Sequence, residues 1–489
     1  MEKCCNFEGR NDLGSSNFGR RGGKKIYCNF EGTDTAAPSH LEITFAQMSE
    51  RKSFDKKNTL VQAQTIFFRQ KICIFHFFVV ILCAFCKNTM KTVRQIFTRH
   101  TYFILYIALC VGLFVGCTEE NGPEPTSQRG EILDTELVKE LSLSDVKKFA
   151  TDSIESSYLH YGVLCYRVTY SSVYEGEPIT TTGLMLLPNS SEADKALCVY
   201  MHGTNWPVEK RSAQQKMPSN YFNNTNPSGG EVATCGIPLA SSGMAVIMPD
   251  YIGFGPTADK EHPFIYYPEL KQANIDGLRA MRNYLKLSGN QEVRLAGWSQ
   301  GGGAALSLHY YIQHEFNDEF TVASSSCLSG PYNYAGLLEG VLRDTTGLVP
   351  PTALCTWSVY VLNRFAVHRN PDQIYTFTVT DQVSAMMNFV GTVWDCFRPY
   401  FTEGVLSGAD TEWINASMKN SFHKGWTPTG KVYLHHGTRD ALVPYFNSED
   451  AYKGLTDAGG DITLYKYEGK DHFNITYKFM NHTLEDWNR

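Results

Sequence analysis

The chain has little of what marks a nucleic-acid-binding or metal-binding protein. Its 489 residues carry a formal net charge of only −6, so nothing in the charge balance points to a nucleic-acid partner. From residue 118 onward the six cysteines are widely spaced and include no Cys-x-x-Cys pair, so no metal site is expected. If the chain is exported to an oxidising compartment, a disulfide between Cys355 and Cys396 is an alternative to free thiols.

Residues 90–117 have the organisation of an export signal. Basic residues follow Met90, and the apolar core at 102–115 is too short for a comfortable membrane span. The segment ends in Gly116-Cys117 and resembles a bacterial lipoprotein signal, although Phe114 stands where that pattern usually has leucine. The resemblance implies lipidation of Cys117 and anchoring to the bacterial cell envelope, at the outer membrane. A plain secretory signal and a short membrane anchor are the alternatives.

The signal divides the chain into parts of different character. Residues 1–89 show no helical or strand period over their first 60 positions, and they contain a second apolar run at 72–86. We interpret them as the product of a mis-assigned start codon or, alternatively, as an extension with another membrane-inserting segment. Residues 118–131 form a polar tether without an apolar pattern. Residues 132–489 then suit one large domain with an insertion.

Strand and helix patterns alternate along this domain. A hairpin is expected at 163–170 and 180–187, and the continuous apolar runs typify strands that are buried on both faces. The alternation predicts an α/β fold with a mainly parallel central sheet flanked by helices. The expected strands are 196–201, 244–249, 292–297, 320–325, 432–435 and 462–467, and the expected helices are 137–150, 231–241, 275–287, 302–316, 448–458 and 476–487.

The stretch at about 332–429 interrupts the alternation. It is rich in aromatic and aliphatic residues, and its patterns are mostly helical. Its place before the last two strands favours a lid or cap that forms an apolar pocket. An extra helical layer without a role toward the substrate is the other interpretation.

A serine stands at the apex of a predicted strand–turn–helix segment. The pentapeptide at 297–301 places Ser299 between Gly297 and Gly301, directly after an apolar run and before a helical pattern. Glycines suit such a crowded turn, and the following helix N-terminus supplies N–H groups that hold an anion. Ser299 is therefore the candidate nucleophile.

Two segments later in the chain supply a base and the group that orients it. Asp440 follows the strand at 432–435, and His472 follows the strand at 462–467, so both lie at the same edge of the expected sheet. A serine hydroxyl needs such a base, and the base needs a third group that fixes its tautomer. We predict Asp440 and His472 as catalytic residues.

Other histidines compete with His472 for the role of the base. His309 should point away from the apex, and His435 and His436 are expected to be structural. Asp471, which precedes His472, is expected to be solvated.

An ester reaction also needs two N–H donors near the serine. The backbone of Gln300 is the first candidate, because it begins the helix after Ser299. The second should come from the loop after the strand at 196–201, where Thr204 is preferred and Asn205 is the alternative. His202 in the same loop is expected to brace the loop rather than to act as a base.

These segments together resemble the α/β-hydrolase superfamily, and within it the chain is similar to the secretory lipase and esterase group. The resemblance rests on the segments at 200–204, 249–255, 297–301 and 437–440, together with His472. It implies a hydrolysis of carboxylic esters through an acyl-enzyme, with a small-molecule or polymer-linked ester as substrate and no metal or organic cofactor. Asp250 is then a loop-shaping residue. A serine peptidase of the prolyl oligopeptidase type without a propeller, and a non-catalytic binding protein, are the alternatives.

Overall fold

The computed structural model describes most of the chain after residue 127. The described ranges are 128–150, 153–194, 196–207, 216–223, 230–343, 352–389 and 391–488. The expected extension at 1–89, the signal at 90–117 with Cys117, and residues 118–127 of the tether lie outside them. None of the described helices combines the length and the apolar composition that crossing a membrane requires.

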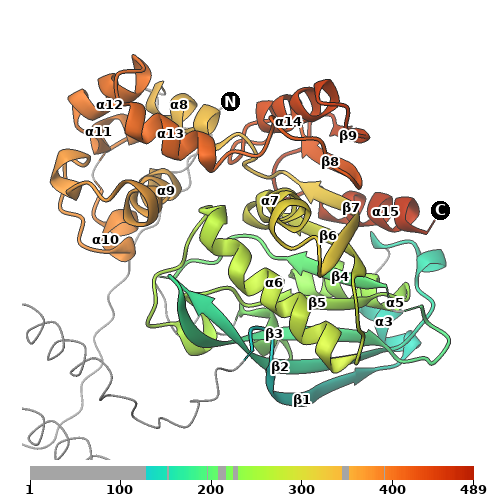
Figure 1. The fold of residues 1–489 in the computed structure, drawn as a ribbon. Helices are drawn as coiled ribbons and strands as arrows, with labels where there is room; N and C mark the ends of the chain where they lie inside the picture. The colour runs from blue at the N-terminus through green and yellow to red at the C-terminus, as the bar shows by residue number, and fades with distance from the viewer. Residues whose placement is uncertain are drawn as a thin grey trace, which may run out of the picture. The chain divides into compact units, whose positions relative to one another are not determined.

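A nine-stranded sheet forms the centre of the described domain, with strand order β1-β2-β3-β5-β4-β6-β7-β8-β9. The pairs β1–β2, β2–β3 and β3–β5 are antiparallel, and the remaining pairs are parallel (Figure 1). The sheet is therefore mainly parallel, as the sequence predicts. The strands are β1 (Ile132–Leu141), β2 (Val163–Tyr174), β3 (Glu177–Pro188), β4 (Leu197–Met201), β5 (Ala245–Pro249), β6 (Gln291–Trp298), β7 (Phe320–Leu328), β8 (Lys431–Gly437) and β9 (Ile462–Tyr467).

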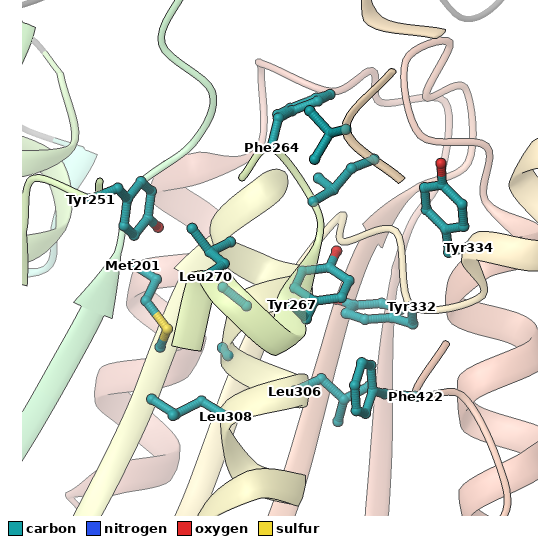
Figure 2. Close-up of a cluster of buried hydrophobic side chains, with 14 of the residues drawn as sticks. Met201, Tyr251, Phe264, Tyr267, Leu270, Leu306, Leu308, Tyr332, Tyr334 and Phe422 are labelled. Carbon is teal, nitrogen blue, oxygen red and sulfur yellow. The ribbon is translucent and has the colours of Figure 1, made fainter. Parts of the chain in front are cut away.

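Two hydrophobic clusters cover the faces of this sheet. One packs α6 (Tyr267–Tyr284), α7 (Gln300–Glu315) and α14 (Phe446–Asp457) on one face. The other packs α3 (Leu143–Ala150), α5 (Ile237–Ser241) and α15 (Thr476–Trp487) on the opposite face. All five residues of β4 and of β5 are buried, because both faces of these strands are covered. Figure 2 shows part of the first cluster, including Tyr267, Leu270, Leu306, Leu308, Tyr332 and Phe422.

The residues between β7 and β8 form a separate group of helices. These are α8 (Tyr334–Arg343), α9 (Thr352–Leu362), α10 (Gln382–Met387), α11 (Val393–Cys396), α12 (Pro399–Leu406) and α13 (Thr411–Lys419), drawn from yellow to orange in Figure 1. Side chains cap several of them, as when Asp381 and Ser384 form a capping box on α10. Arg369 ties this group together by pairing with Asp410 at 2.6 Å and with Glu412 at 2.9 Å. We refer to these helices as the cap.

The structure corrects two expectations at the start of the domain. The predicted helix at 137–150 is strand β1 up to Leu141, and only α3 is helical. The predicted tether at 118–131 also ends earlier than expected. Arg129 pairs with the fully buried carboxylate of Asp276 on α6 at 3.0 Å, and the Gly130 N–H donates to the Ser171 oxygen on β2. Residues 128–131 therefore belong to the folded domain.

Candidate active site

Ser299 occupies a strained turn between β6 and α7. Its φ of 59° and ψ of −121° lie in a region that residues with side chains seldom adopt. A Cβ added to Gly297 would lie 2.3 Å from the Gly301 oxygen, and one added to Gly301 would lie 1.8 Å from the Met201 oxygen. Neither position can hold a larger residue without moving the backbone. The Ser299 N–H donates to the Leu328 oxygen on β7 at 2.8 Å, which holds the turn on the sheet.

His472 and Asp440 are hydrogen-bonded to each other. The Nδ1 of His472 donates to Asp440 Oδ2 at 2.6 Å, and both side chains are buried, with residue exposures of 3% and 8%. The backbone N–H groups of Leu442 and Val443 both donate to Asp440 Oδ1 at 2.9 Å. Donation from Nδ1 leaves His472 Nε2 as the acceptor nitrogen, which is the arrangement that a general base requires.

His436 is a second imidazole on the same carboxylate, a contact that the sequence did not indicate. Its Nε2 lies 2.8 Å from the Val443 oxygen and 3.2 Å from Asp440 Oδ2, and its Nδ1 lies 2.7 Å from Ser448 Oγ. Burial of Asp440 opposes its ionisation, but hydrogen bonds from His436 and His472 hold its pKa well below the usual range. The carboxylate is therefore ionised and can stabilise a positive charge on His472.

Ser299 and His472 line the same cavity from different loops. Among the described residues, no hydrogen bond joins Ser299 Oγ to the His472 ring, a contact that often tightens only when substrate is bound. The two loops are connected through Trp298, whose indole Nε1 donates to the His472 oxygen at 3.2 Å. The candidate nucleophile and the candidate base are thus held together by the residue that precedes the serine.

The two expected N–H donors, on Gln300 and Thr204, also lie on residues that line this cavity. The Gln300 side chain is almost fully buried, and its Nε2 lies 2.7 Å from His262 Nε2. His262 Nδ1 in turn lies 2.7 Å from the Ile252 oxygen, and burial lowers the pKa of His262 to about 4, so its ring is neutral and accepts from Gln300. Sequence reasoning missed His262, because only the fold brings the two residues together.

The cavity itself is largely apolar and has a volume of about 340 Å³. The cap supplies a large share of its wall, mainly through α8 and α9, and Phe264 stacks on Trp357 of α9 at 4.0 Å between ring centroids. Aliphatic and aromatic walls of this kind suit a hydrocarbon or aryl group. The cap residues that line the cavity are Tyr334, Leu337, Leu338, Val341, Leu354, Cys355 and Ser358.

The remaining candidates have structural partners. His309 Nδ1 lies 2.8 Å from Ser325 Oγ in the core, and His435 Nε2 lies 3.1 Å from Ser326 Oγ. Asp250 accepts the Ser219 N–H at 2.9 Å, in keeping with a loop-shaping role. The alternative of a Cys355–Cys396 disulfide is wrong, because neither of these cysteines forms a disulfide. The described residues contain no group of three His, Cys, Asp or Glu side chains that could hold a metal ion.

Comparison with known sequences identifies distant relatives. No protein-family model matches the chain. A secreted triacylglycerol lipase of Malassezia furfur, LIP2, is 24% identical over 316 residues, which cover 61% of this chain and 64% of that protein. A secreted triacylglycerol lipase of Malassezia globosa, LIP4, is 22% identical over 334 residues, covering 65% of this chain and 69% of that protein. The chain thus spans less than two thirds of the first of these relatives.

Solved structures match over more of the chain. The rice cell wall degrading esterase LipA from Xanthomonas oryzae superimposes with a TM-score of 0.62 at 20% identity, covering 74% of this chain and all of that one. A putative hydrolase from Legionella pneumophila gives a TM-score of 0.60 at 21% identity, and the match covers 73% of this chain and 97% of the Legionella chain. The chain therefore has the α/β-hydrolase fold and is similar in sequence to secreted triacylglycerol lipases.

Proposed function

We propose that this chain is a carboxylic ester hydrolase that acts through Ser299, His472 and Asp440. The observation that carries the proposal is the buried His472–Asp440 pair on the same cavity as a serine in a strained turn. The lipases and the esterase to which the chain is similar favour esters over peptides as substrates. The apolar cavity favours an ester with an apolar acyl or aryl group, and the alcohol can be small or part of a polymer.

In the proposed reaction, Ser299 Oγ attacks the ester carbonyl carbon while His472 Nε2 takes its proton. Asp440 stabilises the resulting imidazolium, and the Gln300 and Thr204 N–H groups hold the oxyanion. The alcohol leaves with the proton from His472, and the acyl group stays on Ser299. Water then attacks the acyl-enzyme by the same route in reverse. No metal or organic cofactor enters this scheme.

The test is hydrolysis of p-nitrophenyl esters from acetyl to palmitoyl by the full chain and by Ser299→Ala. Ser307→Ala is the matched control, since Ser307 lies on the same helix and donates only to the Ala304 oxygen. We expect Ser299→Ala to lose several orders of magnitude in kcat and the control to keep its activity. Turnover of Pro-containing peptides without ester turnover would favour a peptidase, and ligand binding without turnover would favour a binding protein.

We further propose that the chain is exported and anchored through a lipid on Cys117 at the bacterial outer membrane, with translation starting at Met90. The secreted lipases to which the chain is similar support export. Mass spectrometry of the mature N-terminus tests each part: a diacylated Cys117 supports the anchor, and an unmodified N-terminus after Cys117 contradicts it. Peptides from residues 1–89 would contradict the start at Met90.

A further inference from the structure

The carboxylate of Glu231 binds the backbone of Gly203, the residue directly before Thr204 in the loop after β4. Its Oε1 and Oε2 accept the Gly203 N–H at 2.9 and 3.1 Å. The hydroxyl of Tyr200 donates to Oε2 at 2.8 Å. A Cβ on Gly203 would lie 3.0 Å from Trp298 Cε3 and 3.3 Å from Glu231 Oε1, so the loop is confined between these two side chains.

Two consecutive peptide units of the loop are fixed by these contacts. In the unit that joins His202 to Gly203, the oxygen accepts the Tyr251 hydroxyl at 2.8 Å and the N–H goes to Glu231. In the next unit, the Gly203 oxygen lies 2.7 Å from His202 Nδ1. Because a trans peptide is planar, fixing that oxygen also fixes the direction of the Thr204 N–H. The Gly203 N–H is already used, and Thr204 lines the cavity whereas Asn205 does not, so the Thr204 N–H is the candidate that remains.

We propose that Glu231 is a positioning residue whose ionised carboxylate holds the Thr204 amide where the oxyanion of the ester reaction forms. This inference rests on the proposed esterase function. Glu231 lies behind the loop and would not touch the substrate, so it acts through the Gly203 backbone.

The surroundings of Glu231 make this support sensitive to pH. Burial raises the pKa of Glu231 to about 7, although the Gly203 N–H and the Tyr200 hydroxyl oppose the shift. The titratable groups that act on it are Tyr200, Cys235 and Tyr251. Burial raises the pKa of Cys235 to about 12 and raises the pKa of both tyrosines well above their usual range. All three are therefore neutral near pH 7, and none of the described groups that act on this carboxylate is a cation.

Protonation changes what the carboxylate can hold. The ionised carboxylate accepts hydrogen bonds from both the Gly203 N–H and the Tyr200 hydroxyl. The protonated carboxyl is a weaker acceptor, and its own hydrogen also needs an acceptor in a place where both neighbours are donors. The hold on Gly203 therefore weakens as the pH falls through about 7, and the rate should fall with it.

The experiment compares kcat and KM for p-nitrophenyl butyrate between about pH 5.5 and 8.5, using the full chain and Glu231→Gln. The ratio of wild-type to variant kcat removes every effect of pH that both proteins share. We expect this ratio to rise from about 1 at the acidic end to about 10 at the basic end, with KM unchanged. The expected loss is smaller than the roughly 10²–10³ seen when an oxyanion donor is deleted, because the Thr204 N–H remains present.

Two further variants sharpen the result. Tyr200→Phe removes a hydrogen bond that lowers the pKa of Glu231. The kcat of this variant should therefore increase with pH at a higher pH than the kcat of the wild type. Glu269→Gln is the matched control, since Glu269 is also half-buried and accepts a backbone N–H, that of Glu175, at 2.7 Å, but lies outside the cavity. Its pH profile should follow the wild type.

A melting series separates a positioning role from a structural one. The pKa of Glu231 is higher in the folded protein than in the unfolded chain, so the protein loses stability as the pH rises from the unfolded pKa through about 7. Glu231→Gln has no carboxyl to ionise and does not lose this stability. It should therefore have a higher melting temperature than the wild type at pH 8.5, although its kcat is lower. A kcat ratio that stays constant with pH in an active enzyme would overturn the role of Glu231 alone. A wild type that hydrolyses no ester would overturn the proposed function, and this role with it.

Discussion

The indole N–H of Trp298 donates to the backbone oxygen of His472 at 3.2 Å, and the two rings lie 5.3 Å apart between centroids. Trp298 is the last residue of β6, directly before Ser299, whereas His472 lies in the loop after β9. The same bond therefore fixes the loop of the candidate base relative to the candidate nucleophile. It joins the end of β6 to the loop after β9, and Trp298 is not among the site residues predicted from the sequence.

Trp298→Phe should lower kcat about fivefold while leaving the fold intact. The substitution removes one hydrogen bond, worth about 1 kcal/mol, and keeps most of the aromatic packing against His472. Steady-state kinetics measures the loss, and circular dichroism checks the fold. Trp394→Phe is the control, because Trp394 lies exposed on the cap surface. Equal activity of both variants would show that Trp298 does not position His472.

Gly301→Ala should prevent the chain from folding to a stable product. The added Cβ would meet the Met201 oxygen at 1.8 Å, so the backbone at the start of α7 would have to move. Gly340→Ala is the matched change within α8, where a Cβ meets nothing within 4 Å. It should raise stability by about 0.5–1 kcal/mol through helix propensity. Thermal unfolding compares the two, and a stable Gly301→Ala protein would contradict the packing described for the turn.

Asp440→Asn should lower kcat about 10⁴-fold, because an amide favours the wrong tautomer of His472. It should also change the acid response. The folded pKa of Asp440 is lowered, so its stabilising effect is present above its unfolded pKa of about 3.9 and is lost as the pH falls further.

The difference in melting temperature between wild type and Asp440→Asn should therefore be largest near neutral pH and shrink below about pH 4. Asp395→Asn is the control, since Asp395 also has a lowered pKa but lies in the cap. It should keep its kcat. A difference that does not change with pH would show that Asp440 is not ionised in the folded protein.

Leu337→Trp should shift the preferred ester toward shorter acyl chains. Leu337 lines the cavity from α8, and the larger ring would occupy part of its 340 Å³. Rates with acetyl, butyryl, octanoyl and palmitoyl esters measure the shift as a change in kcat/KM ratios. Met387→Trp, at an exposed position on α10, should leave the ratios unchanged. An unchanged profile for Leu337→Trp would place the acyl group elsewhere.

Much of the fold was predictable because its signals are local. The hairpin of β2 and β3, the buried runs of β4 and β5, and the glycines around Ser299 each depend on neighbours in the sequence. The predicted helix at 137–150 includes the second half of strand β1, because the residues of β1 are mostly exposed along the sheet edge and show no alternation of apolar and polar side chains. The helix α3 that follows does show helical spacing.

The contacts that support the candidate site were less accessible from the sequence. Asp440 and His472 could be proposed because each follows a predicted strand. The contact of His436 with Asp440 depends on how the loop after β8 turns back toward the end of its own strand. The bond between His262 and Gln300 depends on how two segments far apart in the sequence meet. No period or spacing in one chain reports such a meeting. The catalytic roles of Ser299, Asp440 and His472 remain predictions until the variants are measured.

The absence of disulfides among the described cysteines has a consequence for where the domain can fold. All six are buried thiols, and burial raises the pKa of Cys198 and Cys235 to about 12, which keeps both protonated and poorly reactive. No covalent cross-link between them contributes to the native state. The domain should therefore reach the same structure in a reducing or an oxidising compartment, and its maturation should not depend on a disulfide-forming catalyst.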